Sequence, residues 1–134
     1  MSFVCMTCYR VYPESKKRRF LCPICHELPV QIDDLFASTI AELNKKGYKT
    51  VTCCAGHVND SVPDCYIRFE EEFPENLLPP FIGYCPNGEY NKETKTWTED
   101  RTTLRKRFDL PTKDNFELNA KRLFEWAQGL PVKE

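Results

Sequence analysis

The chain has 134 residues, of which 29% are charged, 41% hydrophobic and 13% aromatic, a composition typical of globular proteins and not of disordered ones. The formal net charge of −1 argues against a protein whose whole surface is committed to DNA or RNA. The length suffices for one domain, or for one domain preceded by a small metal-binding module.

The N-terminus and the hydropathy of the chain predict a cytoplasmic protein without a membrane segment. Residues 1–5 lack the basic stretch followed by an apolar stretch that marks a secretory signal. No apolar run reaches the length that spans a bilayer. The sequence does not indicate an oligomeric state.

Four of the eight cysteines form two Cys-x-x-Cys pairs, Cys5 with Cys8 and Cys22 with Cys25. Each pair makes a tight knuckle, and two facing knuckles give the tetrahedral sulfur cage that zinc accepts. The pattern resembles zinc-ribbon, or rubredoxin-like, modules. We therefore predict a zinc ribbon over residues 1–29, a separate domain over residues 30–134, and zinc as the cofactor because zinc is the usual metal of a structural tetrathiolate.

The residues between the knuckles suit a hairpin. Its predicted arms are Tyr9–Tyr12 and Arg19–Leu21, with residues 13–18 as the tip. Four basic residues at the tip and the adjoining start of the second arm are candidates for contact with nucleic-acid phosphates: Lys16, Lys17, Arg18 and Arg19. An alternative is a solvated tip that offsets the negative charge of the zinc tetrathiolate.

After a short linker, the pattern predicts a helix over residues 33–46 followed by a strand over residues 49–53. Asp33 is the expected N-cap of this helix, and its apolar residues recur at helical spacing. Gly47 is expected to end the helix. The next strand, Cys65–Glu70, alternates between apolar and polar residues and places Arg68 on its polar face.

The second half of the chain predicts three further strand regions and a helix. Residues 81–85 form one strand, residues 89–91 pair with 95–98 across a short turn, and residues 102–108 form another strand. Arg105 and Arg107 share the face of that last strand opposite Leu104, which makes them a candidate anion platform. A helix over residues 113–128 completes the fold. We therefore predict an α+β fold, with two helices packed on a mostly antiparallel sheet.

The most concentrated chemistry lies where the strand after Gly47 ends, in Cys53-Cys54-Ala55-Gly56-His57. Free backbone N–H groups, a glycine and an imidazole can together bind an anion such as a phosphate. In this hypothesis Cys54, Gly56 and His57 contact the ligand. The three arginines named above neutralise it from neighbouring strands.

Two other hypotheses fit the same turn. Cys54 and His57 have the Cys-x-x-His spacing of metal ligands, with further ligands drawn from the remaining cysteines, Cys53, Cys65 and Cys85. Alternatively, His57 activates one thiol as a nucleophile, although no third residue that would orient the histidine is evident and no catalytic residue is assigned. The default interpretation of Cys53, Cys65 and Cys85 is that they are small buried residues.

Residues 43–69 carry a second resemblance. Leu43-Asn44, the stretch from Thr50 to His57 and the hydrophobic strand after it resemble the Ser-Ser-Cys-Ser-Gly-Arg signature of the wybutosine-synthesis methyltransferase family, which acts on a modified guanosine in transfer RNA. His57 stands where that signature has arginine. The resemblance implies a turn suited to a nucleotide-like ligand.

The sequence thus predicts a zinc protein that binds a phosphate-bearing, nucleotide-like small molecule at the Cys54–His57 turn, as a sensor or a sequestering protein. One alternative is a zinc ribbon that binds nucleic acid through Lys16–Arg19. The other is an RNA-modifying or thiol-dependent enzyme.

Overall fold

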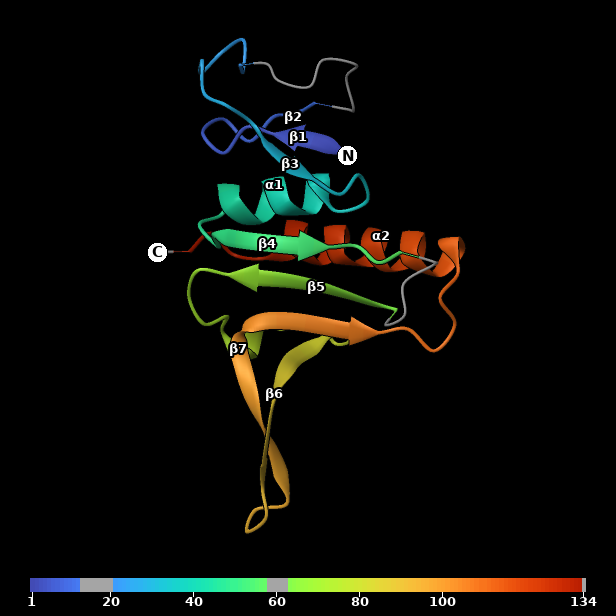
Figure 1. The fold of residues 1–134 in the computed structure, drawn as a ribbon. Coiled ribbons are helices and arrows are strands. Elements are labelled where there is room, and N and C mark those ends of the chain that lie inside the picture. The colour runs from blue at the N-terminus through green and yellow to red at the C-terminus, as the bar shows by residue number, and fades with distance from the viewer. Residues whose placement is uncertain (13–20, 58–62, 134) are drawn as a thin grey trace.

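The computed structural model describes residues 1–12, 21–57 and 63–133. The cysteine-rich N-terminal module lies at one end of the molecule, followed by a helix and then by a larger sheet with a second helix behind it (Figure 1). Within the described residues, all five strand pairs of the two sheets are antiparallel. The predicted α+β class is therefore confirmed.

The N-terminal module is built on three short strands, β1 (Ser2–Val4), β2 (Val11–Tyr12) and β3 (Val30–Ile32), in the order β2-β1-β3. The sequence predicts pairing of residues 9–12 with residues 19–21, and most of that second arm lies outside the described residues. In the described part, β2 pairs with β1, which is too short to be detected from its pattern. Val4 and Ile32 are buried in the main core. Residues 13–20, with the basic tip Lys16–Arg19, lie outside the described residues.

Helix α1 (Ala37–Lys45) begins four residues later than the sequence predicts. Its N-cap is Phe36, which makes no side-chain cap hydrogen bond, so the prediction that Asp33 caps the helix is wrong. The helix ends as expected: Gly47 has a φ of 95°, and the backbone N–H of Tyr48 donates to the carbonyl of Leu43 at 2.9 Å.

The larger sheet contains β4 (Thr50–Cys54), β5 (Asp64–Phe69), β6 (Gly83–Asn91) and β7 (Thr96–Arg107) in the order β4-β5-β7-β6. A short 3-10 helix, η1 (Glu75–Leu77), lies between β5 and β6. Edge strand β4 faces the N-terminal module and α1, with β5 as its neighbour (Figure 1).

Helix α2 (Lys113–Gly129) packs against one face of the larger sheet and against α1. The Thr112 side chain caps it by accepting a hydrogen bond from the Asn115 backbone N–H at 3.2 Å. The core between helices and sheet is apolar, and its largest fully buried side chains include Phe36, Ile40, Leu43, Ile67, Leu104 and Leu123. The starts of α2 and β5 and the ends of β4 and β7 lie at one end of the sheet (Figure 1).

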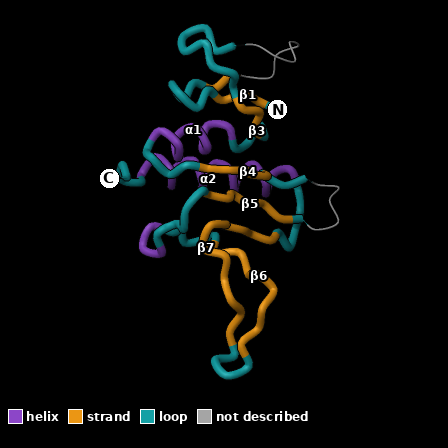
Figure 2. The backbone as a smooth tube through the Cα atoms, turned by 60° about the vertical axis from the view of Figure 1, so that its left-hand side comes forward, coloured by secondary structure: helices purple, strands orange, loops and turns teal. Residues whose placement is uncertain are grey.

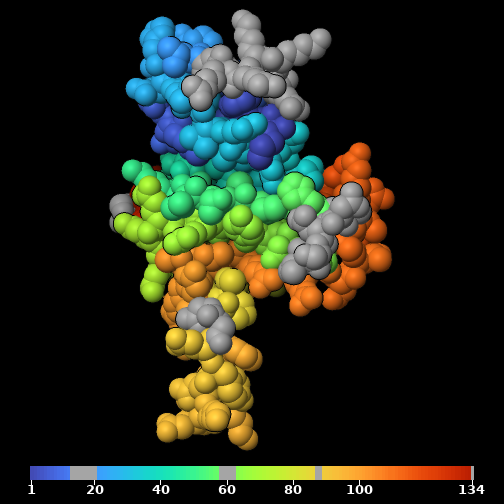
Figure 3. All heavy atoms as spheres, in the orientation of Figure 1, coloured from blue at the N-terminus to red at the C-terminus, as the bar shows by residue number. Residues whose placement is uncertain are grey.

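The β6–β7 hairpin extends away from the rest of the molecule as an arm (Figures 2 and 3). The predicted pairing across its turn is confirmed, because Tyr90 pairs with Trp97 and Asn91 with Thr96. The rings of Tyr90 and Trp97 lie 5.1 Å apart. Both side chains are about half exposed, at 49% and 56%, so the arm is stabilised by its own pairing and not by the core.

Candidate metal centre

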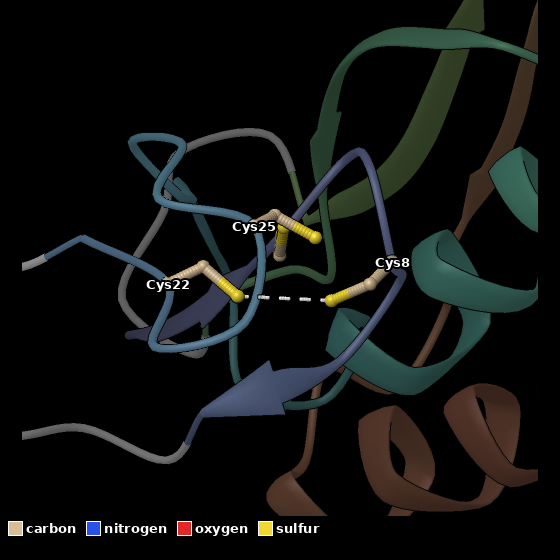
Figure 4. A group of neighbouring side chains, drawn as sticks. Cys8, Cys22 and Cys25 are labelled. Carbon is tan, nitrogen blue, oxygen red and sulfur yellow. Dashed lines mark hydrogen bonds between the residues drawn. The ribbon is translucent and has the colours of Figure 1, made fainter.

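The four cysteines of the N-terminal module converge on one point. The sulfurs of Cys5, Cys8, Cys22 and Cys25 all lie within 4.8 Å of one another, and Cys8 Sγ is 3.7 Å from Cys22 Sγ. Figure 4 shows Cys8, Cys22 and Cys25 pointing into a common space. Sulfurs about 3.8 Å apart are what a tetrahedral site with metal–sulfur bonds of about 2.3 Å requires. The cluster can therefore hold a metal ion.

Both cysteine pairs are shaped by the same backbone turn. The N–H of Tyr9 donates to the Cys5 carbonyl at 2.7 Å, and the N–H of His26, which is equally far along its own knuckle, donates to the Cys22 carbonyl at 2.8 Å. Tyr9 and His26 have φ values of 63° and 57°. In each knuckle, this residue with left-handed backbone reverses the direction of the chain. The two sulfurs of the knuckle therefore face the other knuckle. The position of His26 is explained by this backbone role.

The pKa values of the Cys22 and Cys25 thiols are shifted in opposite directions. A hydrogen bond joins Tyr12 Oη to Cys22 Sγ at 3.2 Å; it is the main reason that the pKa of Cys22 falls to about 6 and that of Tyr12 rises to about 12. The pKa of Cys25 rises to about 12 because of desolvation first and then the neighbouring sulfurs Cys8 and Cys5. Four thiolates at this spacing repel one another, so a cation is needed to hold them all in the deprotonated form.

A second group of potential ligands lies at the turn that ends β4. One side-chain atom each of Asp33, Cys54 and His57 falls within 4.8 Å of the other two. The carboxylate of Asp33 accepts a hydrogen bond from the Ala55 backbone N–H at 2.9 Å. The structure thus brings Cys54 and His57 together, as the sequence predicted, and adds Asp33. No local pattern could have identified Asp33 as a neighbour, because the contact joins residues 22 positions apart.

Gly56 is also at this turn, with a φ of 103°. A Cβ at this position would lie 2.7 Å from Cε1 of Phe116. The sequence predicts that a ligand approaches closely at this glycine, whereas the space beside its α-carbon contains the Phe116 ring. The glycine is explained by this packing and by its left-handed backbone.

By strand register, all three candidate arginines share a sheet face with Cys54. Cys54 pairs with Tyr66, which pairs in turn with Arg105, and Arg68 lies on the same side of β5 as Tyr66. Arg105 is already engaged, because its Nε donates to Asp64 Oδ2 at 2.6 Å. This hydrogen bond is the main reason that the pKa of Arg105 is raised. The structure therefore does not bring Arg105 to the turn as a free cation.

Arg107 lies at the end of β7 and lines a different feature. This is a pocket of about 300 Å³ that we call the basic pocket, lined by Lys106, Arg107, Phe108, Asp109, Leu110, Asn115, Leu118, Asn119 and Arg122. Three of these side chains are cationic and one is anionic. Lys106 and Arg122 were not among the predicted site residues; Lys106 precedes Arg107 in β7, and the packing of α2 on β7 adds Arg122 to the lining.

The three remaining cysteines, Cys53, Cys65 and Cys85, belong to neither of these two ligand groups. Burial is the main reason that the pKa of Cys53 rises to about 12 and that of Cys65 to about 11. Cys65 is fully buried, and Cys53 packs against the core. The thiols of both residues thus stay protonated at neutral pH, which agrees with their default interpretation. Cys85 is half-buried, and its thiol donates to the Pro86 carbonyl at 3.4 Å.

Comparison with known proteins returned no match: neither a family model, nor a curated protein, nor a solved structure matches this chain. The resemblance to the wybutosine-synthesis methyltransferase signature thus rests on residues 43–69 alone. Within the described ranges, no helix is both long and apolar enough to cross a membrane. What geometry supports directly is a chain with a four-cysteine cluster that can bind a metal ion.

Proposed function

We propose that this protein is a zinc-binding protein whose N-terminal module holds one structural zinc ion through Cys5, Cys8, Cys22 and Cys25. The observation that carries this proposal is the convergence of the four sulfurs within 4.8 Å. Four protein ligands fill a tetrahedral zinc site and leave no position for a substrate. The zinc would fix the two knuckles relative to β1 and β3, which place Val4 and Ile32 in the main core.

Zinc content and one matched pair of variants test this role. Cys8→Ser should lower the zinc content by one ion per chain in elemental analysis. Cys85→Ser, which changes another half-buried cysteine outside the cluster, should leave the zinc content unchanged. A Cys8→Ser protein with the full zinc content would contradict the proposal.

We further propose that the protein binds a phosphate-bearing small molecule of nucleotide type, as a sensor or a sequestering protein. The basic pocket supports this function, because the residues Lys106, Arg107 and Arg122 line a space of about 300 Å³ together with the acidic residue Asp109. Arginine and lysine are the usual protein partners of phosphate groups. Asn115, in the first turn of α2, also lines the pocket, and a helix N-terminus favours anions.

The pocket and the Cys54–His57 turn are close neighbours. Phe108 lines the pocket and packs edge-on against Phe116 at 4.6 Å between ring centroids, and Phe116 lies against Gly56. Asp33 adds a negative charge to the turn itself. We therefore place the phosphate groups in the basic pocket.

A thermal-shift experiment with nucleotides, cyclic nucleotides and pyrophosphate tests this proposal. At least one of these anions should raise the melting temperature, and the double variant Arg107→Ala/Arg122→Ala should abolish the shift. Arg101→Ala is the matched control, because Arg101 is an exposed arginine of the same strand that lies over the Tyr84 ring, outside the pocket. The His57→Ala variant tests whether the ligand binds at the Cys54–His57 turn instead of in the basic pocket. Loss of the shift only in His57→Ala would move the ligand to the turn, and no shift with any anion would refute the function.

A further inference from the structure

We propose that Asp33, Cys54 and His57 form a second metal site, which takes a divalent transition metal such as zinc through three protein ligands and leaves a fourth position for an exchangeable ligand. Three different ligand types, a carboxylate, a thiol and an imidazole, converge within 4.8 Å. This inference does not rest on the basic pocket or on the ribbon zinc.

The backbone explains why Cys54 and His57 face the same point. Cys54 is the last residue of β4, and two residues later the chain turns back at Gly56, which has a φ of 103°. The Phe116 ring lies against this turn. Cys54 and His57 are therefore held at the spacing of a metal-binding knuckle by the packing of α2 against the end of β4.

Asp33 reaches the site from the segment that joins β3 to α1, and two interactions fix this segment against edge strand β4. The carboxylate of Asp33 accepts from the Ala55 N–H at 2.9 Å, and the Asp33 backbone forms a hydrogen bond to the Cys53 sulfur. A ligating carboxylate is commonly oriented by such a second hydrogen bond. Asp33 is thus positioned as a ligand before any ion binds.

The charges and donor types select the class of metal. A carboxylate and a thiolate together balance a 2+ ion, while the imidazole binds as a neutral donor. Mixed sulfur, nitrogen and oxygen donors suit zinc and its neighbours among the transition metals, whereas magnesium and calcium prefer oxygen alone.

The ligands of the second site are more exposed than those of the ribbon cluster. Two of the four ribbon sulfurs belong to fully buried residues, whereas Asp33 and Cys54 are half-buried and His57 is exposed. Three ligands at an accessible position leave room for water or for an external ligand in the fourth tetrahedral position, as in zinc sites that bind substrates. The ribbon would therefore hold a structural ion, and the second site would hold an ion with an exchangeable ligand.

Native mass spectrometry of the full chain, purified with zinc, tests this inference. The wild-type protein should carry two zinc ions. Asp33→Asn, Cys54→Ser and His57→Ala should each carry one, and Cys85→Ser should carry two, because Cys85 is another half-buried thiol outside both clusters. A wild-type chain with one zinc ion, or a His57→Ala chain with two, would overturn the second site.

Cobalt titration of the wild-type protein provides a readout that does not depend on the folding of a variant. The ribbon ion should have four sulfur ligands and the second ion only one, so the two equivalents should differ clearly in the intensity of their sulfur-to-cobalt absorption. Equal intensities, or saturation at one equivalent, would overturn the inference. Failure of the ribbon proposal is recognised separately: Cys8→Ser should still bind one ion, and Cys8→Ser/His57→Ala none.

Discussion

The α-carbon of Gly56 and the ring of Phe116 are packed so closely that no side chain fits between them. An added Cβ would lie 2.7 Å from Phe116 Cε1, in a backbone conformation with a φ of 103°. Gly56→Ala should therefore destabilise the protein by about 1–3 kcal/mol, from backbone strain and from displacement of the ring. Urea unfolding followed by circular dichroism measures this change.

Gly129→Ala is the control for this substitution. Gly129 ends α2, and among the described residues no atom beyond its chain neighbours and its own helix backbone lies within 4 Å of where its Cβ would be. Its replacement should leave the unfolding free energy unchanged or raise it slightly, because alanine favours the helical conformation. Equal stability of the two variants would show that the contact with Phe116 does not constrain position 56.

The ion pair between Arg105 and Asp64 should contribute to stability and not to anion binding. Its two atoms are 2.6 Å apart, and both side chains are at least two-thirds buried, with exposures of 32% and 21%. Arg105→Ala should cost about 1 kcal/mol because it leaves Asp64 without its charged partner. A double-mutant cycle with Asp64→Ala measures the coupling. A coupling near zero, or loss of nucleotide binding in Arg105→Ala, would contradict this assignment.

Removal of the ribbon metal should loosen the N-terminal module and leave the core folded. Thiolate ligands must lose their protons to bind zinc, so acidification below neutral pH should release the ion, as should a strong chelator at neutral pH. Hydrogen exchange should then increase in residues 1–12 and 21–32, while α2 keeps its protection. Unchanged exchange in those ranges after metal removal would show that the ion is not what holds the knuckles.

Alkaline pH should destabilise the protein through the buried thiol of Cys65. Its ordinary pKa of 9.0 rises to about 11, mainly because of burial. Between these values the unfolded chain loses a proton that the folded chain keeps, so stability is fully present below about pH 9 and decreases as pH rises toward 11. The loss assigned to this residue is roughly 2–3 kcal/mol.

Denaturant unfolding between pH 8 and 11 measures this dependence, and Cys65→Ala provides the comparison. The variant starts from a lower stability because a packed side chain is removed, but its stability should decrease less steeply with pH. Parallel curves for the two proteins would mean that Cys65 ionises equally in the folded and unfolded states.

Much of the fold was predictable because local patterns encode it. The two Cys-x-x-Cys pairs specify their own knuckles. Helix α2 begins at Lys113 as predicted, and the Tyr90–Trp97 pairing follows from strand residues on either side of a short turn. The pairing of β1 with β2 and β3 was not predictable, since strands of two or three residues are too short to show a pattern.

The residues of the candidate sites also differ in whether local sequence patterns predict them. Cys54 and His57 are three positions apart and could be grouped by their spacing, whereas Asp33 is joined to them only by the path of the chain along the edge of β4. Asp33 also begins a plausible helix pattern, which favoured the wrong role of N-cap. The basic pocket likewise combines Arg122 of α2 with Arg107 of β7, a grouping that neither segment predicts alone.

Because one tryptophan lies on the β6–β7 arm and the other lies in α2, the molecule has a built-in pair of optical reporters. Of the two tryptophans, Trp97 lies on the arm against Tyr90, while Trp126 donates to the Leu77 carbonyl at 2.9 Å and contacts Phe73 at the edge of the core. In the Trp126→Phe variant the remaining Trp97 fluorescence therefore reports on the arm. In the Trp97→Phe variant the remaining Trp126 fluorescence reports on the core. Because the arm is held by its own ladder, it can open as a separate cooperative unit, and the two emissions need not change together during unfolding.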